Sequence, residues 1–248
     1  MDERRDRVEP ETPAAVKSVS IIAMGHSRER YLHDFDRNNY SRPTNEAWGV
    51  NSVMYWFGPE LLTHGIAMDN FERDMEMDGG IHKAYVEKML GCGLPIMADV
   101  EYPQWPQVQA YPIDDVVDDI WSGPELPLPD LENTINFAIA LAIHRKFDEL
   151  RLYGCDFRLR DDTSALMQVH GALEKIKPWW FIYHNSDIVK FRRDLEPGEP
   201  TTMFLLGVAH ARGIKIHIAE GSSLCGNDRG RYAYGYQKQP VIWDTAHD

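Results

Sequence analysis

The sequence has few cysteines and no long hydrophobic run. Its three cysteines, Cys92, Cys155 and Cys225, are widely spaced and form no CxxC or Cys/His pattern. Neither a disulfide framework nor a zinc site is therefore predicted, and we expect reduced thiols in a cytoplasmic protein. No stretch reaches the roughly 18 apolar residues of a membrane span. The charged N-terminus also lacks the apolar segment of a signal peptide, so no membrane partner is expected.

Positive charge is also scarce. The chain has 26 Lys and Arg against 39 Asp and Glu, a formal net charge of −13. It therefore has no overall basic field of the kind that drives nucleic-acid binding, and a DNA acceptor is not favoured unless a local basic groove exists. Basic residues gather at 28–42, 145–160 and 190–193, and we interpret them as solvated surface.

Several catalytic motifs are missing from the sequence. It contains no GxSxG, HExxH or GxxxxGK[ST] pattern. The chemistry of α/β-hydrolases, zinc metalloproteases and P-loop enzymes is therefore unsupported, and no resident metal site is predicted from these patterns.

Short apolar runs alternate with stretches of helical periodicity. Helices are predicted at about 80–90, 131–147 and 201–211, with Asp130 as N-cap of the second and Gly213 as left-handed cap of the third. This alternation predicts an α/β fold: a Rossmann-like, mostly parallel sheet with helices on both faces. The predicted strands lie at residues 18–24, 46–50, 65–68, 94–98, 149–153 and 214–218.

The chain is interpreted as one domain with a tail. Residues 1–16 are expected to form a flexible N-terminal tail, and residues 17–248 a single Rossmann-like domain. Two regions break the pattern: 99–130 is rich in proline with interleaved tryptophan, and 155–200 is polar and aromatic. Long irregular segments in compact domains are often lids or binding loops, so both regions are predicted to be inserts or lids. Their aromatic rings suit stacking on a base or a sugar.

Polar residues follow the first three predicted strands. Ligands of doubly wound sheets bind beyond the carboxyl ends of the strands. The turn Gly25-His26-Ser27 would aim backbone N–H groups at a phosphate, with Ser27 as a donor; the alternative is a plain turn with Ser27 as N-cap. Asn51 is interpreted as a contact to base or ribose; the alternative is an ordinary turn residue. Asp69 would bind a ribose hydroxyl, a metal ion or a substrate amine, or would cap the next helix.

Further candidates follow the later strands and begin the apolar helix. Asp156 comes directly after the fifth predicted strand, as a metal ligand or base, or as a turn carboxylate. Ser222 follows the last strand and could line the same pocket. Asn133 and Thr134 occupy the first turn of the helix at 131–147, whose dipole favours an anion.

Two of the ten histidines are candidates for proton transfer. His26 lies in the glycine turn, where an imidazole would reach a phosphate. His184 lies beside the tryptophans of the region 155–200.

The order of these signals resembles the hydroxymethylpterin pyrophosphokinase-like and bacterial sialyltransferase-like group of Rossmann proteins, which includes phage members. Those proteins typically open with an apolar strand and a Gly-x-Gly-Pro-Ser-type turn. A strand ending in Asn, one ending in an acidic residue, a small polar helix start and an LYGxD strand follow. Here His26 replaces the usual proline. The matching segments are Met24–Ser27, Trp48–Asn51, Ala67–Asp69, Asn133-Thr134 and Leu152–Asp156.

The resemblance implies a nucleotide-dependent transferase with a nucleotide or nucleotide-sugar donor. A glycosyltransferase using a nucleotide-activated sugar comes first. An ATP- and Mg²⁺-dependent diphosphotransferase, with Asp69 and Asp156 as metal ligands, is the alternative, and a non-catalytic nucleotide-binding module is the third. The acceptor stays open, and a homo-oligomer is compatible with the sequence. The predicted nucleotide contacts are Gly25, Ser27, Asn51, Asp69, Asn133, Thr134 and Ser222, and the predicted catalytic residues are His26, Asp156 and His184.

Overall fold

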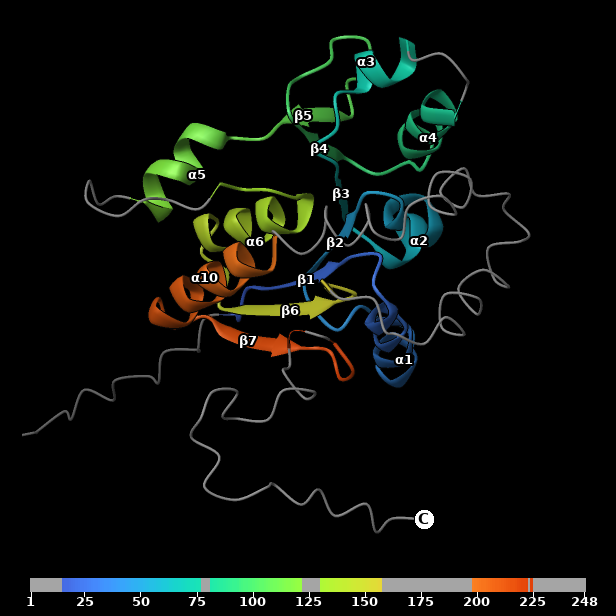
Figure 1. Ribbon diagram of the computed structural model, residues 1–248. Coiled ribbons are helices and arrows are strands. Elements are labelled where there is room, and N and C mark those ends of the chain that lie inside the picture. The colour runs from blue at the N-terminus through green and yellow to red at the C-terminus, as the bar shows by residue number, and fades with distance from the viewer. Residues whose placement is uncertain (1–14, 77–80, 122–129, 158–197, 223, 225–248) are drawn as a thin grey trace, which may run out of the picture.

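The computed structural model describes residues 15–76, 81–121, 130–157, 198–222 and 224 (Figure 1). These residues form a seven-stranded sheet in the order β5-β4-β3-β2-β1-β6-β7. Every pair of neighbouring strands is parallel. The predicted α/β fold with a Rossmann-like parallel sheet is confirmed.

The strands are short, and the central ones are largely buried because helices cover both faces of the sheet. They are β1 (Ser18–Ile22), β2 (Glu46–Val50), β3 (His64–Ile66), β4 (Ile96–Ala98), β5 (Val108–Ala110), β6 (Glu149–Tyr153) and β7 (Lys215–Ile218). The helices are η1 (His26–Arg28), α1 (Glu29–Arg37), α2 (Val53–Leu61), α3 (Phe71–Glu76), α4 (Ile81–Leu90), α5 (Ile113–Ile120), α6 (Thr134–His144) and α10 (Gly198–Ala211).

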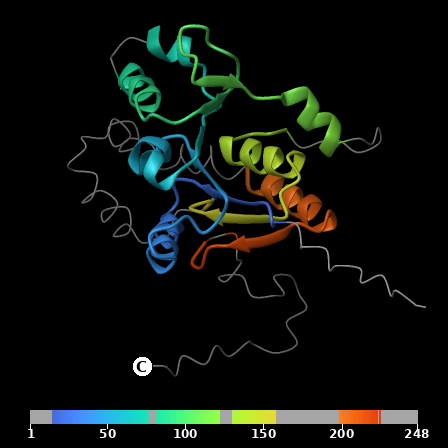
Figure 2. The ribbon, with the colours of Figure 1, turned by 180° about the vertical axis from the view of Figure 1, so that it is seen from behind.

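Two hydrophobic cores lie on opposite faces of the sheet. Helices α5, α6 and α10 cover one face, and α1, α2 and α4 cover the other (Figures 1 and 2). Successive residues of a strand point to opposite faces. Ile21 of β1 accordingly packs in the α6 core and Ile22 in the α1 core. The helix α6 is apolar nearly all round because it packs against the sheet, α5 and α10.

The predicted elements differ from the observed ones mainly in the region 99–130. That region contains β5, which was not predicted, and α5. The strand was missed because only Val108 of its three residues is buried, so no apolar run marks it. The predicted lid at 155–200 falls almost entirely outside the described residues, as does most of the predicted tail.

The predicted caps of two helices can be compared with the observed ones. The N-cap of α6 is Asn133 and not the predicted Asp130, because the Asn133 Oδ1 accepts a hydrogen bond from the Asn136 amide at 3.1 Å. The predicted left-handed cap after α10 is confirmed, with a φ of 81° at Gly213.

Among the described residues, no helix combines the length and apolarity needed to cross a membrane.

The strand order reverses direction between β1 and β6. The chain leaves β1 toward β2, β3, β4 and β5 on one side, and returns through α6 to β6 on the other. In open α/β sheets such a switch point opens a crevice at the carboxyl ends of the strands. Both α6 and α10 lead into strands, so their N-termini lie at this same edge (Figure 1).

Candidate functional site

The ends of β1 and β6 are joined beyond the strands themselves. The Ala23 amide donates to the Tyr153 carbonyl, and the Gly25 amide donates to the Gly154 carbonyl, both at 2.8 Å. Glycine is required on both sides of this contact. A Cβ at Gly25 would lie 2.3 Å from Asp156 Oδ2, and a Cβ at Gly154, whose φ is +65°, would lie 2.2 Å from the Ala23 oxygen. The glycines therefore bring the two strand ends together.

Ser27 and Asp156 form the centre of this junction. The Ser27 amide donates to Asp156 Oδ2 at 2.8 Å, and the Ser27 hydroxyl donates to Oδ1 at 3.0 Å. The same hydroxyl accepts from the Gly154 amide at 2.9 Å. Both side chains are buried, with 5% and 7% exposure. Asp156 thus caps the first turn of η1 from the neighbouring strand, and Ser27 is not the cap.

These contacts occupy the groups that were expected to bind phosphate. The Gly25 amide and the Ser27 amide and hydroxyl all have protein partners. A direct phosphate contact from Gly25 or Ser27 stays a prediction, as does a catalytic role for Asp156. What the structure adds is a rigid turn at the switch point.

Asn51 directly follows β2, beside this turn, and has an unused acceptor. Its φ is +53°, a conformation that asparagine tolerates better than most residues. Its amide donates to the Ile66 carbonyl at 2.9 Å. Its side-chain Oδ1 is buried and has no hydrogen-bond partner among the described residues. Such an atom costs about 1–3 kcal/mol, which a bound ligand would recover.

Asn133 presents an unused donor at the start of α6. While its Oδ1 caps the helix, its Nδ2 is buried without a partner in the described part of the chain. A Cβ at Gly198 would lie 1.6 Å from this nitrogen and 3.2 Å from Phe157, so the start of α10 packs closely against both Asn133 and Phe157. Thr134 follows as the first residue of α6. The positive ends of two helix dipoles therefore meet at this edge.

Asp69 and Ser222 lie at the ends of more distant strands. Asn70, not Asp69, caps α3, since its Oδ1 accepts from the Arg73 amide at 2.9 Å. The pKa of the Tyr85 phenol is raised, first by burial and then by the charge of Asp69, so these two groups are close. The Ser222 hydroxyl accepts from the Leu224 amide at 3.3 Å, within the turn after β7.

The structure does not describe the side chain of either candidate histidine. The backbone of His26 lies in η1, and its imidazole is not described. His184 falls outside the described residues. Proton transfer by either residue stays a prediction.

Arg28 and Trp56 lie at the same edge and were not among the candidates. The Arg28 guanidinium donates to the Met24 carbonyl and lies 5.2 Å from the centre of the Trp56 ring. The sequence places Arg28 in a basic stretch that was interpreted as solvated surface. Its position directly after the glycine turn was the signal that could have distinguished it.

A magnesium site shared by Asp69 and Asp156 does not fit this geometry. Their strands, β3 and β6, are separated by β2 and β1, so the strand ends are about 14 Å apart at the usual strand spacing. Both oxygens of Asp156 also accept hydrogen bonds from Ser27. Within the described ranges, no group of three or more His, Cys, Asp or Glu side chains could hold a metal ion.

No protein-family model and no curated protein matches the chain. Among solved structures, it is similar to the sialyltransferase CstII from Campylobacter jejuni in complex with a substrate analogue, CMP-3FNeuAc. That likeness has 13% sequence identity and a TM-score of 0.44, and covers 85% of this chain and 84% of the other. The complex of the same enzyme with cytidine-5′-monophosphate gives 13% identity, a TM-score of 0.44, and 85% and 83% coverage. At this identity the likeness concerns the fold and not the activity.

Proposed function

We propose that this protein is a nucleotide-dependent transferase whose donor is a nucleotide-activated sugar. The observation that carries the proposal is the pair of buried, unused amide atoms at the switch point, Asn51 Oδ1 and Asn133 Nδ2. One is an acceptor and the other a donor, and they come from β2 and α6, on either side of the rigid β1 turn. Buried polar atoms of this kind suit a polar ligand that completes their hydrogen bonds.

Each group has a role that follows from its chemistry. Asn51 Oδ1 would accept from a base amino group or a ribose hydroxyl. Asn133 Nδ2 and the amides that begin α6, with Thr134, would donate to the sugar or phosphate. Gly25, Ser27, Asp69 and Ser222 would line the same edge. Catalysis would rest on positioning and on stabilising the leaving phosphate, with His26, His184 and Asp156 as the proposed acid–base groups.

Glycosyl transfer is preferred to ATP-dependent diphosphate transfer. The sequence motifs resemble those of a protein group whose members catalyse either reaction. The preference for glycosyl transfer therefore rests on the geometry of the site. The diphosphate reaction needs Mg²⁺ bridged between phosphates and carboxylates. Asp69 and Asp156 lie on strands that are not neighbours, and Asp156 is engaged by Ser27. This arrangement supports a donor held by amides and helix ends.

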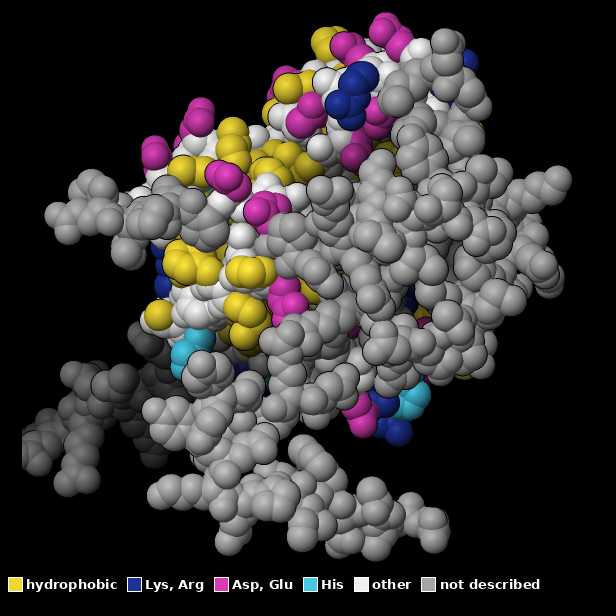
Figure 3. Space-filling view, in the orientation of Figure 1, with side chains coloured by type: hydrophobic (Ala, Val, Ile, Leu, Met, Phe, Trp, Pro, Cys, Tyr) yellow, Lys and Arg dark blue, Asp and Glu magenta, His cyan; other side chains and the backbone are white. Residues whose placement is uncertain are grey.

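DNA is not the favoured acceptor. Aspartates lie along α5, on the face shown in Figure 3. That helix would repel a phosphate backbone, in keeping with the net charge of −13. The four residues are Asp114, Asp115, Asp118 and Asp119.

The proposal is tested by binding and by turnover. We would titrate the protein with CMP, CDP, UDP, GDP, ADP and ATP, with and without Mg²⁺, and then assay release of nucleotide from sugar donors. We expect Mg²⁺-independent binding of one nucleotide and turnover of its sugar donor. Binding confined to ATP with Mg²⁺ would support diphosphate transfer, and binding without turnover of any donor would support the non-catalytic module.

Two variants connect the result to the site. Asn51→Gly removes the amide but keeps a residue that tolerates positive φ. Asn133→Ser keeps an N-cap but removes the Nδ2 donor. Each should weaken nucleotide binding about 10-fold, or about 1.4 kcal/mol. Asn45→Ser, at the opposite edge of the sheet, is the matched control, and unchanged affinity in both site variants would refute the proposal.

A further inference from the structure

Arg28 is a half-buried cation that is held by neutral groups. Its guanidinium donates to the Met24 carbonyl and lies over the Trp56 ring, 5.2 Å from the ring centre. Burial lowers the pKa of Arg28, while the carboxylates of Glu29 and Asp156 act in the opposite direction. Arginine stays charged under such conditions. The side chain is therefore a fixed positive charge with a defined orientation.

This charge has no carboxylate partner at contact distance among the described residues. The neighbouring Arg30 pairs with Asp34 at 3.7 Å and with Glu220 at 3.5 Å, whereas no ion pair of 4.0 Å or less involves Arg28. The Asp156 carboxylate, which acts on it electrostatically, is engaged by Ser27. Buried charges are usually paired, so an unpaired one at a crevice suits an anionic ligand.

Trp56 contributes a second unused donor at the same place. Its Nε1 is buried and lacks a hydrogen-bond partner in the described part of the chain. A buried indole N–H usually finds a partner. Of the five N–H groups of a guanidinium, Arg28 uses one for the Met24 carbonyl. Donors of both side chains therefore remain available where the guanidinium lies on the indole.

Both residues lie at the switch point. A Cβ at Gly154 would come within 2.9 Å of the Arg28 Cβ, so the arginine packs against the end of β6. Trp56 is in α2, the helix that follows β2 and Asn51. The pair thus spans the carboxyl end of β1, between the β2 and β6 ends that carry Asn51 and Asp156.

We infer that Arg28 and Trp56 form a phosphate-binding element that takes the phosphate group of the nucleotide. This inference rests on the proposed nucleotide-dependent function and assigns its phosphate contact, which the engaged groups of Ser27 and Gly25 leave open. The guanidinium supplies charge and directed N–H groups, and the indole supplies one N–H and the surface that orients the guanidinium.

The test separates phosphate binding from nucleoside binding. Dissociation constants are measured for cytidine and CMP, uridine and UMP, adenosine and AMP, and guanosine and GMP. For each pair, the dissociation constant of the nucleoside divided by that of the nucleotide measures the contribution of the phosphate to binding. Arg28→Gln should reduce this ratio about 10-fold for the base that binds and leave the nucleoside affinity unchanged. Arg28→Lys should be intermediate, because it keeps the charge but not the planar group.

Further variants make the outcome decisive. Trp56→Phe keeps an aromatic face but removes the N–H, and should reduce the ratio about threefold. Arg30→Gln, two residues along the chain, is the matched control and should leave the ratio unchanged. An unaltered ratio in Arg28→Gln, or an equal loss for nucleoside and nucleotide, would overturn the inference while nucleotide binding stands. If the wild-type protein binds no nucleotide, the proposed function fails as well.

Discussion

Both carboxylate oxygens of Asp156 accept hydrogen bonds from Ser27, one from its amide at 2.8 Å and one from its hydroxyl at 3.0 Å. The two residues are 129 positions apart in the sequence and follow two neighbouring strands of the sheet, β1 and β6. Because both are buried, loss of either leaves a polar group without its partner. This pair therefore stabilises the fold at the place where the proposed ligand binds.

A double-mutant cycle measures that contribution. We expect Asp156→Ala to lower the free energy of unfolding by about 3 kcal/mol and Ser27→Ala by about 1–2 kcal/mol. The double variant should lose about 1 kcal/mol less than the sum, since the residues share their hydrogen bonds. Urea unfolding gives all three values. Asp36→Ala, on the exposed side of α1, should stay within about 0.5 kcal/mol of wild type, and strict additivity would show that the pair is not coupled.

The close approach at Gly154 gives a second prediction. Gly154→Ala forces a β-carbon to within 2.2 Å of the Ala23 oxygen at a φ of +65°. The clashing Ala23 carbonyl is backbone and the Arg28 Cβ also lies close, so the clash is not easily relieved and we expect a loss of at least about 3 kcal/mol in unfolding free energy. Gly207→Ala, inside α10 with no atom within 4 Å of its Cβ, should instead stabilise by about 0.5–1 kcal/mol. Equal effects of the two substitutions in urea unfolding would contradict the steric argument.

The sequence predicted the sheet well where strands are buried on both faces. The bounds of β2 and β6 match their apolar runs, whereas the edge strand β5, with only Val108 buried, left no signal. Asn51 and Asp156 were selected because ligands of open α/β sheets bind at the carboxyl ends of the strands. Both residues do lie at that edge of the sheet. Hydrogen-bond partners could not be predicted, because they join residues far apart in the chain. Arg28 was missed since its contact with Trp56, on another helix, joins residues that are distant in the chain.

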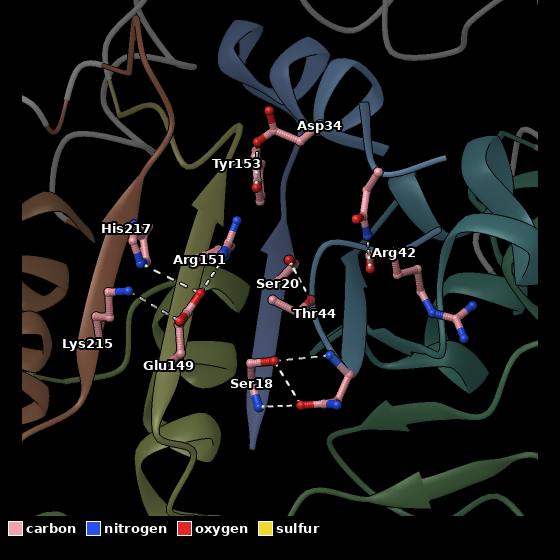
Figure 4. A network of polar contacts seen from close by, with 12 residues as sticks. Ser18, Ser20, Asp34, Arg42, Thr44, Glu149, Arg151, Tyr153, Lys215 and His217 are labelled. Carbon is pink, nitrogen blue, oxygen red and sulfur yellow. Dashed lines mark hydrogen bonds and ion pairs between the residues drawn. The ribbon is translucent and has the colours of Figure 1, made fainter. Parts of the chain in front are cut away.

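A charge network on β6 and β7 gives a pH-dependent prediction. Glu149 lies 2.6 Å from Arg151, 3.7 Å from Lys215 and 3.6 Å from His217 (Figure 4). Burial alone would raise the pKa of Glu149, but the hydrogen bond from Arg151 and the charges of Arg151, His217 and Lys215 outweigh it and lower the pKa. A carboxylate with a lowered folded-state pKa stabilises the fold above its unfolded pKa of about 4.3. That stability is lost as the pH falls through the folded value.

Comparison of wild type with Glu149→Gln tests the predicted direction of this pH dependence. The wild type should be more stable by about 1 kcal/mol at neutral pH, a modest value because the partners are partly exposed. The difference should shrink below about pH 4.3 and disappear once Glu149 is protonated in both states. Denaturant unfolding at a series of pH values gives the curve. Glu87→Gln, whose partner Lys83 lies 3.9 Å away on an exposed face, should change little at any pH. A difference that grows in acid would mean that burial dominates the pKa of Glu149.

Asn136 joins the two helix N-termini at the proposed site. Its side chain is fully buried, and its Nδ2 donates to the Gly198 carbonyl at 3.2 Å and to the Thr202 hydroxyl at 2.7 Å. Asn136→Ala removes both bonds and leaves the Gly198 carbonyl without this donor, so we expect a loss of about 2–3 kcal/mol in unfolding free energy. Thr202→Val removes only one bond and should cost about half as much. Because α6 and α10 would separate at their N-termini, Asn136→Ala should also weaken nucleotide binding at a temperature where the variant is folded. Retained affinity would show that the site does not depend on the pairing of these helices.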